Sequence, residues 1–209
     1  MNRTSVKTPR GRPREFDSDA AIEAALQLFW TKGFEATAIS DVVAATGVNR
    51  ASLYAAFGGK EDLFLKVLER YETNYGGTAT AALYSTGNAK AVIQRFLDQS
   101  AAYLTDPGHP RGCLVSSTLA EAPHSAAAAM RKLTDSLARL ETAIYNLLRS
   151  AQTKGGFAAD ADPRAWARHI VGVTQGMALV AKVNSDPTAV SDIARVTMTS
   201  WPDSAAGHG

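Results

Sequence analysis

Apolar residues recur every three or four positions along most of this chain, which is the period of an amphipathic α-helix. Segments with this period cover residues 17–31, 60–75, 89–104, 113–121, 125–154, 163–183 and 187–200. Glycine and proline separate these segments, and the sequence contains no hairpin pattern typical of strands. The glycine pair at 76–77 is expected to interrupt the helix that begins at Lys60, and the alanine-rich segment after it either resumes the helix or frays. The pattern predicts an all-α protein of about nine helices.

The segment 37–60 contains two short helical patterns joined by a glycine. Val42 lies on the apolar face of the first pattern, and Thr37 stands where a side-chain hydroxyl would cap its N-terminus. Gly47 supplies a sharp corner, after which Leu53 can pack inward at helical spacing. Two short helices joined in this way predict a helix-turn-helix, whose usual role is to read DNA.

The outward positions of the second short helix carry residues that suit a major groove. Arg50 can pair with guanine through two hydrogen bonds, Asn49 can pair with adenine, and the methyl group of Ala51 can contact thymine. Ser52 and Tyr54 can donate hydrogen bonds to phosphates. These five residues, together with Thr37, are therefore predicted DNA contacts.

Positive charge is concentrated at the N-terminus. The formal net charge is +2, yet five basic residues precede the first acidic one, Glu15, so the remainder of the chain is acidic. Arginines flanked by Gly and Pro favour an extended arm, which fits the narrow minor groove beside a helix in the major groove. We expect Arg12 and Arg14 to contact DNA, with Arg10 further out. The alternative is a solubilising tail without a partner.

Four segments in order resemble the tetracycline-repressor-like (TetR) transcriptional regulators. They are RGRPREFD, ALQLFWTKGFEAT, ATGVNRASLYAAF and GGKEDLFLKVLERY, and they cover roughly the first quarter of the chain. The resemblance implies an all-helical homodimer that binds a double-stranded DNA operator through an N-terminal three-helix domain. It also implies that Lys60, at the start of the fourth helix, holds a phosphate. Ala55 stands where the family often has a larger tyrosine or histidine, so a DNA contact at that position is not expected.

The same resemblance implies a C-terminal helical domain that dimerises and holds a small-molecule effector. We therefore divide the chain into a basic arm (1–14), a helix-turn-helix domain (15–60), an effector-binding and dimerisation domain (61–201) and a tail (202–209). The last two helices, 166–183 and 188–201, are the expected dimer interface, and internal packing of these helices is the alternative. A rigid helix after Lys60 would couple the two domains, which favours a repressor released by an effector.

Large side chains of the C-terminal half that could converge between helices are the candidate walls of an effector pocket. They are Tyr103, Leu119, Tyr145, Trp166, His169, Ile170, Val173 and Met177. The alternative is that these residues form the core. Gly172 and Gly176, four positions apart, could allow two helices to approach closely.

Cys113 is the single cysteine and follows Arg111 at a predicted helix N-terminus, with His109 nearby. A positive environment of this kind lowers the pKa of a thiol, so Cys113 could serve as an electrophile or redox sensor. The alternative is a small buried cysteine that only packs. A metal site from His109, Cys113 and His124 is weakly supported, because Pro110 and the lack of a second cysteine leave no regular ligand spacing. No metal and no cofactor are expected.

Composition narrows the classes further. With 209 residues, 45% of them hydrophobic, the chain can fill a core, but no apolar run approaches the roughly 20 residues that span a bilayer. No secretory signal or catalytic motif is present, so we expect a cytoplasmic protein that is not an enzyme. A helical protein-interaction module without DNA reading is the remaining alternative. Arg50 discriminates the two, since only a base-reading arginine would carry sequence preference.

Overall fold

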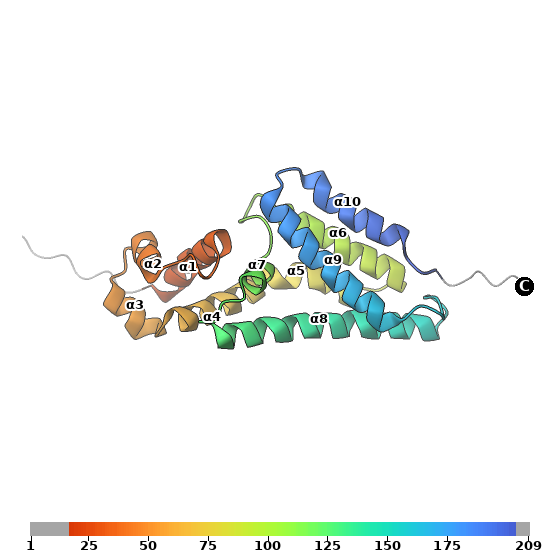
Figure 1. Cartoon of the computed structure of the whole chain (residues 1–209), viewed down its shortest axis with the longest axis horizontal. Coiled ribbons are helices and arrows are strands. Elements are labelled where there is room, and N and C mark those ends of the chain that lie inside the picture. Colours follow the sequence, from red (N-terminus) through yellow and green to blue (C-terminus); the bar gives the residue numbers. More distant parts are fainter. Residues whose placement is uncertain (1–16, 204–209) are drawn as a thin grey trace, which may run out of the picture.

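The computed structural model describes residues 17–203, apart from the side chains of Thr78 and Pro187. Within these residues the protein is all-helical and contains no strand (Figure 1). The α-helices are α1 (Ser18–Lys32), α2 (Ile39–Thr46), α3 (Arg50–Phe57), α4 (Lys60–Tyr71), α5 (Gly77–Thr80), α6 (Ala89–Thr105), α7 (Leu114–Glu121), α8 (Ala127–Thr153), α9 (Pro163–Val183) and α10 (Pro187–Thr199). A π-helical turn (Glu72–Gly76) and a 3-10 turn (Ala81–Tyr84) complete the element order. The predicted all-α class is confirmed.

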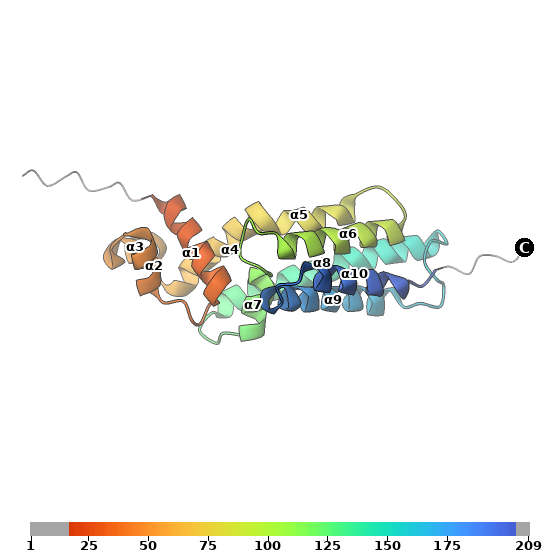
Figure 2. The same cartoon turned by 90° about the horizontal axis from the view of Figure 1, so that it is seen from above.

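Helices α1 to α3 gather at one end of the molecule around the start of α4, and we call α1–α4 the head (Figures 1 and 2). Its core is aromatic: Phe29 stacks on Phe34 with ring centroids 5.8 Å apart, and Phe64 of α4 meets Phe29 edge-on at 4.8 Å. Leu114 of α7 and Leu133 of α8 are fully buried in the same cluster. The head is therefore packed directly against α7 and the N-terminal part of α8.

The N-terminus of α8 is capped by a residue from the head. Ala126 occupies the capping position and offers no side-chain acceptor. Glu61 of α4 supplies it instead, because its Oε1 accepts hydrogen bonds from the backbone N–H groups of Ala128 at 2.6 Å and Ala129 at 3.2 Å. A carboxylate at this position also interacts favourably with the helix dipole. This contact ties the head to the longest helix.

The helical path that starts at Lys60 continues through the glycine pair, where an interruption was predicted. After Tyr71 the backbone widens into the π-turn, and both Gly76 and Gly77 keep right-handed helical dihedral angles. Glycine in a helix costs about 1 kcal/mol relative to alanine but does not forbid the conformation. The regular α-helix is thus interrupted by the π-turn just before the glycine pair, and the chain resumes as α5, which packs with the 3-10 turn against α6.

The remaining helices form the body, which we define as α6, α9, α10 and the C-terminal part of α8. Helix α10 packs against both α6 and α9, and α9 packs along α8 (Figure 2). Fully buried residues include Ile93 and Leu97 of α6, Ile144 of α8 and Ile170 of α9. The body core and the head core are separate clusters, and Tyr103 and Cys113 pack against both.

Candidate DNA-reading helix and effector cavity

The corner between α2 and α3 is built from local hydrogen bonds. Gly47 has the left-handed conformation (φ 67°), and its N–H donates to the carbonyl of Val43 at 2.9 Å. Asn49 then caps α3, since its Oδ1 accepts from the N–H of Ser52 at 2.9 Å. In α3 only Leu53 is buried, at 2% exposure. Phe57 also packs partly buried against the head core, and the exposed residues of α3 can meet a partner.

The predicted reading residues share the outward surface of α3. Asn49, Arg50, Ala51 and Tyr54 are exposed, and Ser52 is half-buried. Arg50 is held along the helix, because its Nη2 donates to the hydroxyl of Tyr54 at 3.2 Å and its guanidinium carbon lies 5.4 Å from the centre of that ring. An arginine has five N–H donors, so this contact leaves several of them available.

Thr37 does not have its predicted place. It is 1% exposed, and its hydroxyl donates to the carbonyl of Gly33 at 2.7 Å, so it neither caps α2 nor faces outward. The cap position is Ala38, whose N–H donates to Asp41 at 3.1 Å. This hydrogen bond and the nearby Lys32 ammonium, 3.2 Å from Oδ2, lower the pKa of the Asp41 carboxyl. The predicted cap by Thr37 is therefore wrong, and its burial leaves the side chain no surface for the predicted DNA contact.

Lys60 is half-buried at the head's surface, where its ammonium donates to the carbonyl of Glu35 at 3.3 Å and lies 4.4 Å from the ring centre of Phe34. These contacts fix its position at the N-terminus of α4. The predicted minor-groove contacts Arg12 and Arg14 lie outside the described residues.

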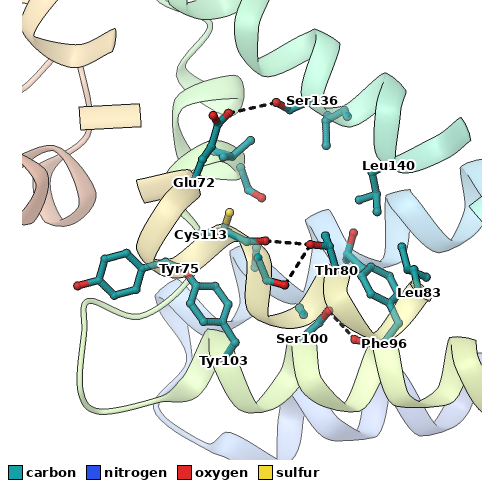
Figure 3. A pocket seen from close by; sticks show the side chains of 18 of the residues that line it. Glu72, Tyr75, Thr80, Leu83, Phe96, Ser100, Tyr103, Cys113, Ser136 and Leu140 are labelled. Carbon is teal, nitrogen blue, oxygen red and sulfur yellow. Dashed lines mark hydrogen bonds between the residues drawn. The ribbon is translucent and has the colours of Figure 1, made fainter. Parts of the chain in front are cut away.

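A cavity of about 460 Å³ lies where the head meets the body, with the π-turn, α6, α7, α8 and α9 as its walls. Its lining is mostly aromatic and aliphatic, and it includes Tyr71, Tyr75, Leu83, Phe96, Tyr103, Leu104, Cys113, Val115, Leu137, Leu140 and Ala178. In Figure 3, Ser136 and Leu140 of α8 face Ser100 and Tyr103 of α6 across it. A space of this size is in the range of pockets that hold small-molecule ligands.

Three polar groups form a chain at the head side of the cavity. The hydroxyls of Tyr71 and Tyr103 are 2.7 Å apart, and the Tyr71 hydroxyl is 3.3 Å from Sγ of Cys113. Burial raises the pKa of Tyr71 well above its ordinary value, and burial likewise raises the pKa of Tyr103. Both phenols therefore stay protonated at neutral pH. Tyr71 belongs to α4, so the chain links the cavity to the head.

Of the eight predicted pocket residues, the structure places only Tyr103 in the lining of this cavity. Ile170 and Met177 are fully buried in the body core, and Val173 packs partly buried against it. Leu119 packs against the head core. The sequence prediction selected large apolar side chains, and on α9 these fill the core. The cavity wall on that helix is made by Thr174, Gln175 and Ala178 instead.

The other three predicted pocket residues lie near the far end of the body. Tyr145 faces the guanidinium of Arg164, whose central carbon is 3.7 Å from its ring centre. Trp166 meets Trp201 edge-on at 6.0 Å, and the exposed His169 contacts Trp166 at 5.4 Å. These aromatic contacts stabilise the end of the body that lies away from the head.

Cys113 is half-buried at the N-cap of α7, as its position in the sequence predicted. The expected cationic neighbour points elsewhere, because Arg111 donates to the carbonyls of Ala181 at 3.0 Å and Asn184 at 2.9 Å at the end of α9. Tyr71 is the polar group next to the sulfur. Within residues 17–203 no group of three or more His, Cys, Asp or Glu side chains is arranged to hold a metal, and His124 is exposed.

Sequence reasoning missed a contact that joins the head to the segment before Cys113. Trp30 of α1 is 1% exposed and donates from Nε1 to the carbonyl of Gly112 at 3.3 Å. Its ring stacks on His109 at 4.7 Å and meets Tyr71 edge-on at 4.9 Å. The only signal in the sequence was a large aromatic residue near the end of a helix, and that signal does not specify a partner 82 positions away.

Comparison with known proteins decides the family. A family model for bacterial regulatory proteins of the tetR family matches residues 21–67, and a model for the tetracyclin repressor-like C-terminal domain matches residues 89–197. The HTH-type transcriptional repressor ComR of Escherichia coli K12 is 32% identical over 201 residues, which is 95% of each chain. The chain belongs to the TetR family. It is accordingly a DNA-binding transcriptional regulator.

Two further proteins resemble it over most of its length. The uncharacterized regulator YezE of Bacillus subtilis 168 is 28% identical over 191 residues, covering 90% of this chain and 98% of that one. A structure of a cysteine mutant of the regulator CifR, complexed with 26-bp double-strand operator DNA, has a TM-score of 0.82 and 28% identity, covering 92% of this chain and all of that one.

TetR-family proteins typically dimerise, and this chain exposes an apolar surface on its last two helices. Leu179 and Val183 of α9 are 60% and 77% exposed, and Val196 of α10 is 55% exposed. Gly172 and Gly176 lie on the same face of α9, where an added Cβ would meet no atom within 4 Å. Among the described residues, no helix is long and apolar enough to cross a membrane.

Proposed function

We propose that this TetR-family regulator is a homodimeric repressor that reads an operator with α3 and is released when a small molecule occupies the cavity between head and body. The observation that carries the proposal is the composition of α3, whose outward surface gathers Asn49, Arg50, Ala51, Ser52 and Tyr54. A surface of this composition suits the major groove. A regulator with this role acts in the cytoplasm, on chromosomal DNA, and needs no catalytic step.

The hydrogen bonds that the residues of α3 already make within the protein determine which of their atoms can contact DNA. Arg50 uses part of its guanidinium on Tyr54 and keeps enough donors for a bidentate contact with guanine. Asn49 uses its Oδ1 on the α3 cap, so its amide NH₂ group is the part that can donate to a base. Lys60 contacts a phosphate, and Arg12 and Arg14 enter the adjacent minor groove.

The dimer forms through the exposed apolar stripe of α9 and the adjoining face of α10. Gly172, Gly176, Leu179 and Val183 follow one another at intervals of four, three and four residues, which keeps them on one helix face. The two glycines permit close approach of a partner helix. An exposed apolar surface of this kind is typical of interaction sites. Two reading heads per dimer would contact half-sites about one helical turn of DNA apart.

The cavity supports release because it borders groups from both cores. Tyr71 of the head and Tyr103 of the body meet in its wall, so a ligand there can bias the angle between head and body. Such a change alters the spacing of the two reading heads in a dimer. A ligand that binds both arrangements equally would shift nothing, so release requires differential affinity.

The test is fluorescence anisotropy of the full chain on the DNA upstream of its own gene, against scrambled DNA of equal length. Arg50→Ala should cost about 1–3 kcal/mol of binding to the specific DNA and much less to scrambled DNA. Arg149→Ala is the matched control, since Arg149 is an exposed arginine near the far end of α8. Equal losses on both DNAs would reduce Arg50 to a phosphate contact, and no preference by the wild type would contradict the proposal.

A second candidate is a repressor that senses electrophiles or oxidants through Cys113. The observation that favours it is the position of the thiol, which lines the cavity 3.3 Å from the Tyr71 hydroxyl. Addition of the thiol to an activated carbon–carbon double bond would break its π bond, form a carbon–sulfur bond and move the thiol proton to the adjacent carbon, which places a new group between head and body. Cys113→Ser should then abolish release of DNA by an alkylating reagent or by peroxide. Unaltered release in this variant would exclude the thiol mechanism and leave non-covalent ligands.

A further inference from the structure

The walls of the cavity suit a mainly apolar molecule. Tyr75, Phe96 and Tyr103 supply aromatic surface, Leu83 adds aliphatic surface beside Phe96, and Leu140 adds aliphatic surface from α8 (Figure 3). Burial of apolar area contributes roughly 25 cal/mol per Å² to binding before the costs of association. With about 460 Å³ available, the space admits a two-ring molecule.

The charged residues of the lining are already engaged with neighbouring groups. Glu72 lies 3.3 Å from the ammonium of Lys132 and accepts a hydrogen bond from Ser136 at 3.4 Å. Arg139 donates to the same Ser136 hydroxyl at 2.6 Å. No other charged residue in the described part of the chain lines the cavity. Arg139 has no carboxylate partner among these residues, but it is exposed to solvent, so it offers an anion only a screened counter-charge. An ionic group taken into the apolar part of the cavity would lose its hydration for that weak interaction, which disfavours it.

Three hydroxyls in the lining have given their protons to their own helices. Ser100 donates to the carbonyl of Phe96 at 2.7 Å, and Thr174 donates to the carbonyl of Val171 at 2.8 Å. Thr80 of α5 donates to the carbonyl of Gly76 in the π-turn at 3.1 Å. Such hydroxyls can only accept further hydrogen bonds. Donors for a ligand must come from other groups.

The Tyr103, Tyr71 and Cys113 chain retains one such donor. Three groups carry three protons and make two contacts, at 2.7 Å and 3.3 Å, so one proton is left over: on an end group if the chain runs in one direction, or on Tyr71 if both neighbours donate to it. All three groups, Tyr103, Tyr71 and Cys113, line the cavity. The side chains of Gln175 and Ser116 also line it and have no hydrogen-bond partner among the described residues, which adds further donors.

From this arrangement we infer that the cavity takes a neutral, largely apolar molecule whose carbonyl-type or ether-type oxygen accepts a hydrogen bond from the Tyr103–Tyr71–Cys113 chain. The inference rests on the proposed function in one respect: the bound molecule would be the effector that releases the DNA. Binding itself can be measured without DNA.

Three probes of matched shape separate the requirements. Benzophenone has two rings and a carbonyl acceptor, diphenylmethane lacks the acceptor, and 4-benzoylbenzoate adds a charge. Each is titrated while the single cysteine, Cys113, reacts with N-ethylmaleimide, followed by intact mass. In this reaction the sulfur adds to the double bond and the thiol proton ends on the neighbouring carbon. A probe in the cavity covers the sulfur, so alkylation slows in proportion to occupancy.

Benzophenone should protect Cys113 saturably. Diphenylmethane should bind at least about fivefold more weakly, because it leaves the donor unpaired. The anion should bind at least about tenfold more weakly, because burial removes its hydration and the solvent-exposed Arg139 offers its charge only a screened partner. The alkylation rate of the urea-unfolded chain should not respond to any probe, which controls for direct effects on the reagent.

Cavity variants check the location by calorimetry. Leu140→Trp should abolish benzophenone binding, whereas Ala138→Trp, at an exposed position of α8, should not. If Leu140→Trp unfolds, Ser116→Phe from α7 serves the same purpose. Equal affinities for benzophenone and diphenylmethane, tighter binding of the anion, or no protection by any probe would each overturn the inference.

Operator anisotropy separates this result from the proposed function. If benzophenone protects Cys113 but leaves operator binding unchanged at saturation, the ligand class stands and the release role of the cavity fails. If the chain shows no preference for operator DNA, the repressor proposal fails while the probe result stands.

Discussion

Replacing Glu61 by alanine tests whether the head stabilises the body through the cap on α8. The carboxylate accepts two backbone N–H groups, from Ala128 at 2.6 Å and Ala129 at 3.2 Å, and no side chain of α8 itself can replace it. Hydrogen bonds to charged groups contribute about 1.5–3 kcal/mol each when buried. Both contacts are only partly buried, so water recovers part of the loss. We expect a loss of about 2 kcal/mol in the free energy of unfolding.

For a chain of this length, that loss corresponds to a fall in Tm of about 4–8 °C. The assay is thermal unfolding followed by circular dichroism, with all variants at one protein concentration because dimerisation contributes to stability. Glu69→Ala is the matched control, since this carboxylate of the same helix makes only an exposed pair with Lys66 at 3.1 Å. Such pairs contribute about 0–1 kcal/mol. A change for Glu61→Ala no larger than that for Glu69→Ala would refute the reasoning.

Three further predictions concern the head. Asp41→Asn should lower Tm at pH 7, because folding lowers the pKa of the Asp41 carboxyl and its ionised form therefore stabilises the protein. This stabilisation is present above the unfolded pKa of about 3.9 and is lost as pH falls through the folded pKa. A Tm difference between wild type and variant that persists undiminished at pH 2 would contradict the prediction. Trp30→Phe should cost about 2–3 kcal/mol in urea unfolding through the lost hydrogen bond to Gly112 and reduced packing, and a loss below about 1 kcal/mol would mean that the contact is dispensable. Asn49→Ala should remove the α3 cap at a cost of about 1 kcal/mol, and Asn49→Ser should restore stability; if Asn49→Ser also restores full operator affinity, the asparagine does not read a base.

The helix-turn-helix could be predicted from the sequence because its determinants are local. Gly47 needs a left-handed backbone that glycine adopts without strain, and the cap at Asn49 reaches only three residues. The period of apolar residues likewise placed most helices within a few residues of their observed ends. These signals involve neighbours along the chain, so they can be read without knowing the fold.

The cavity and the joint between head and body depended on contacts between distant segments. Nothing near Glu61 in the sequence specifies that it caps a helix 67 positions away, and the same holds for Trp30 and Gly112. Large apolar residues such as Ile170 are equally compatible with a core and with a pocket wall, and only packing placed them in the core. The sequence determined the elements and the reading surface of α3, because these rest on local backbone preferences. Tertiary packing alone decided where space was left between the helices, because a cavity remains only where the side chains of several distant helices do not fill the space between them.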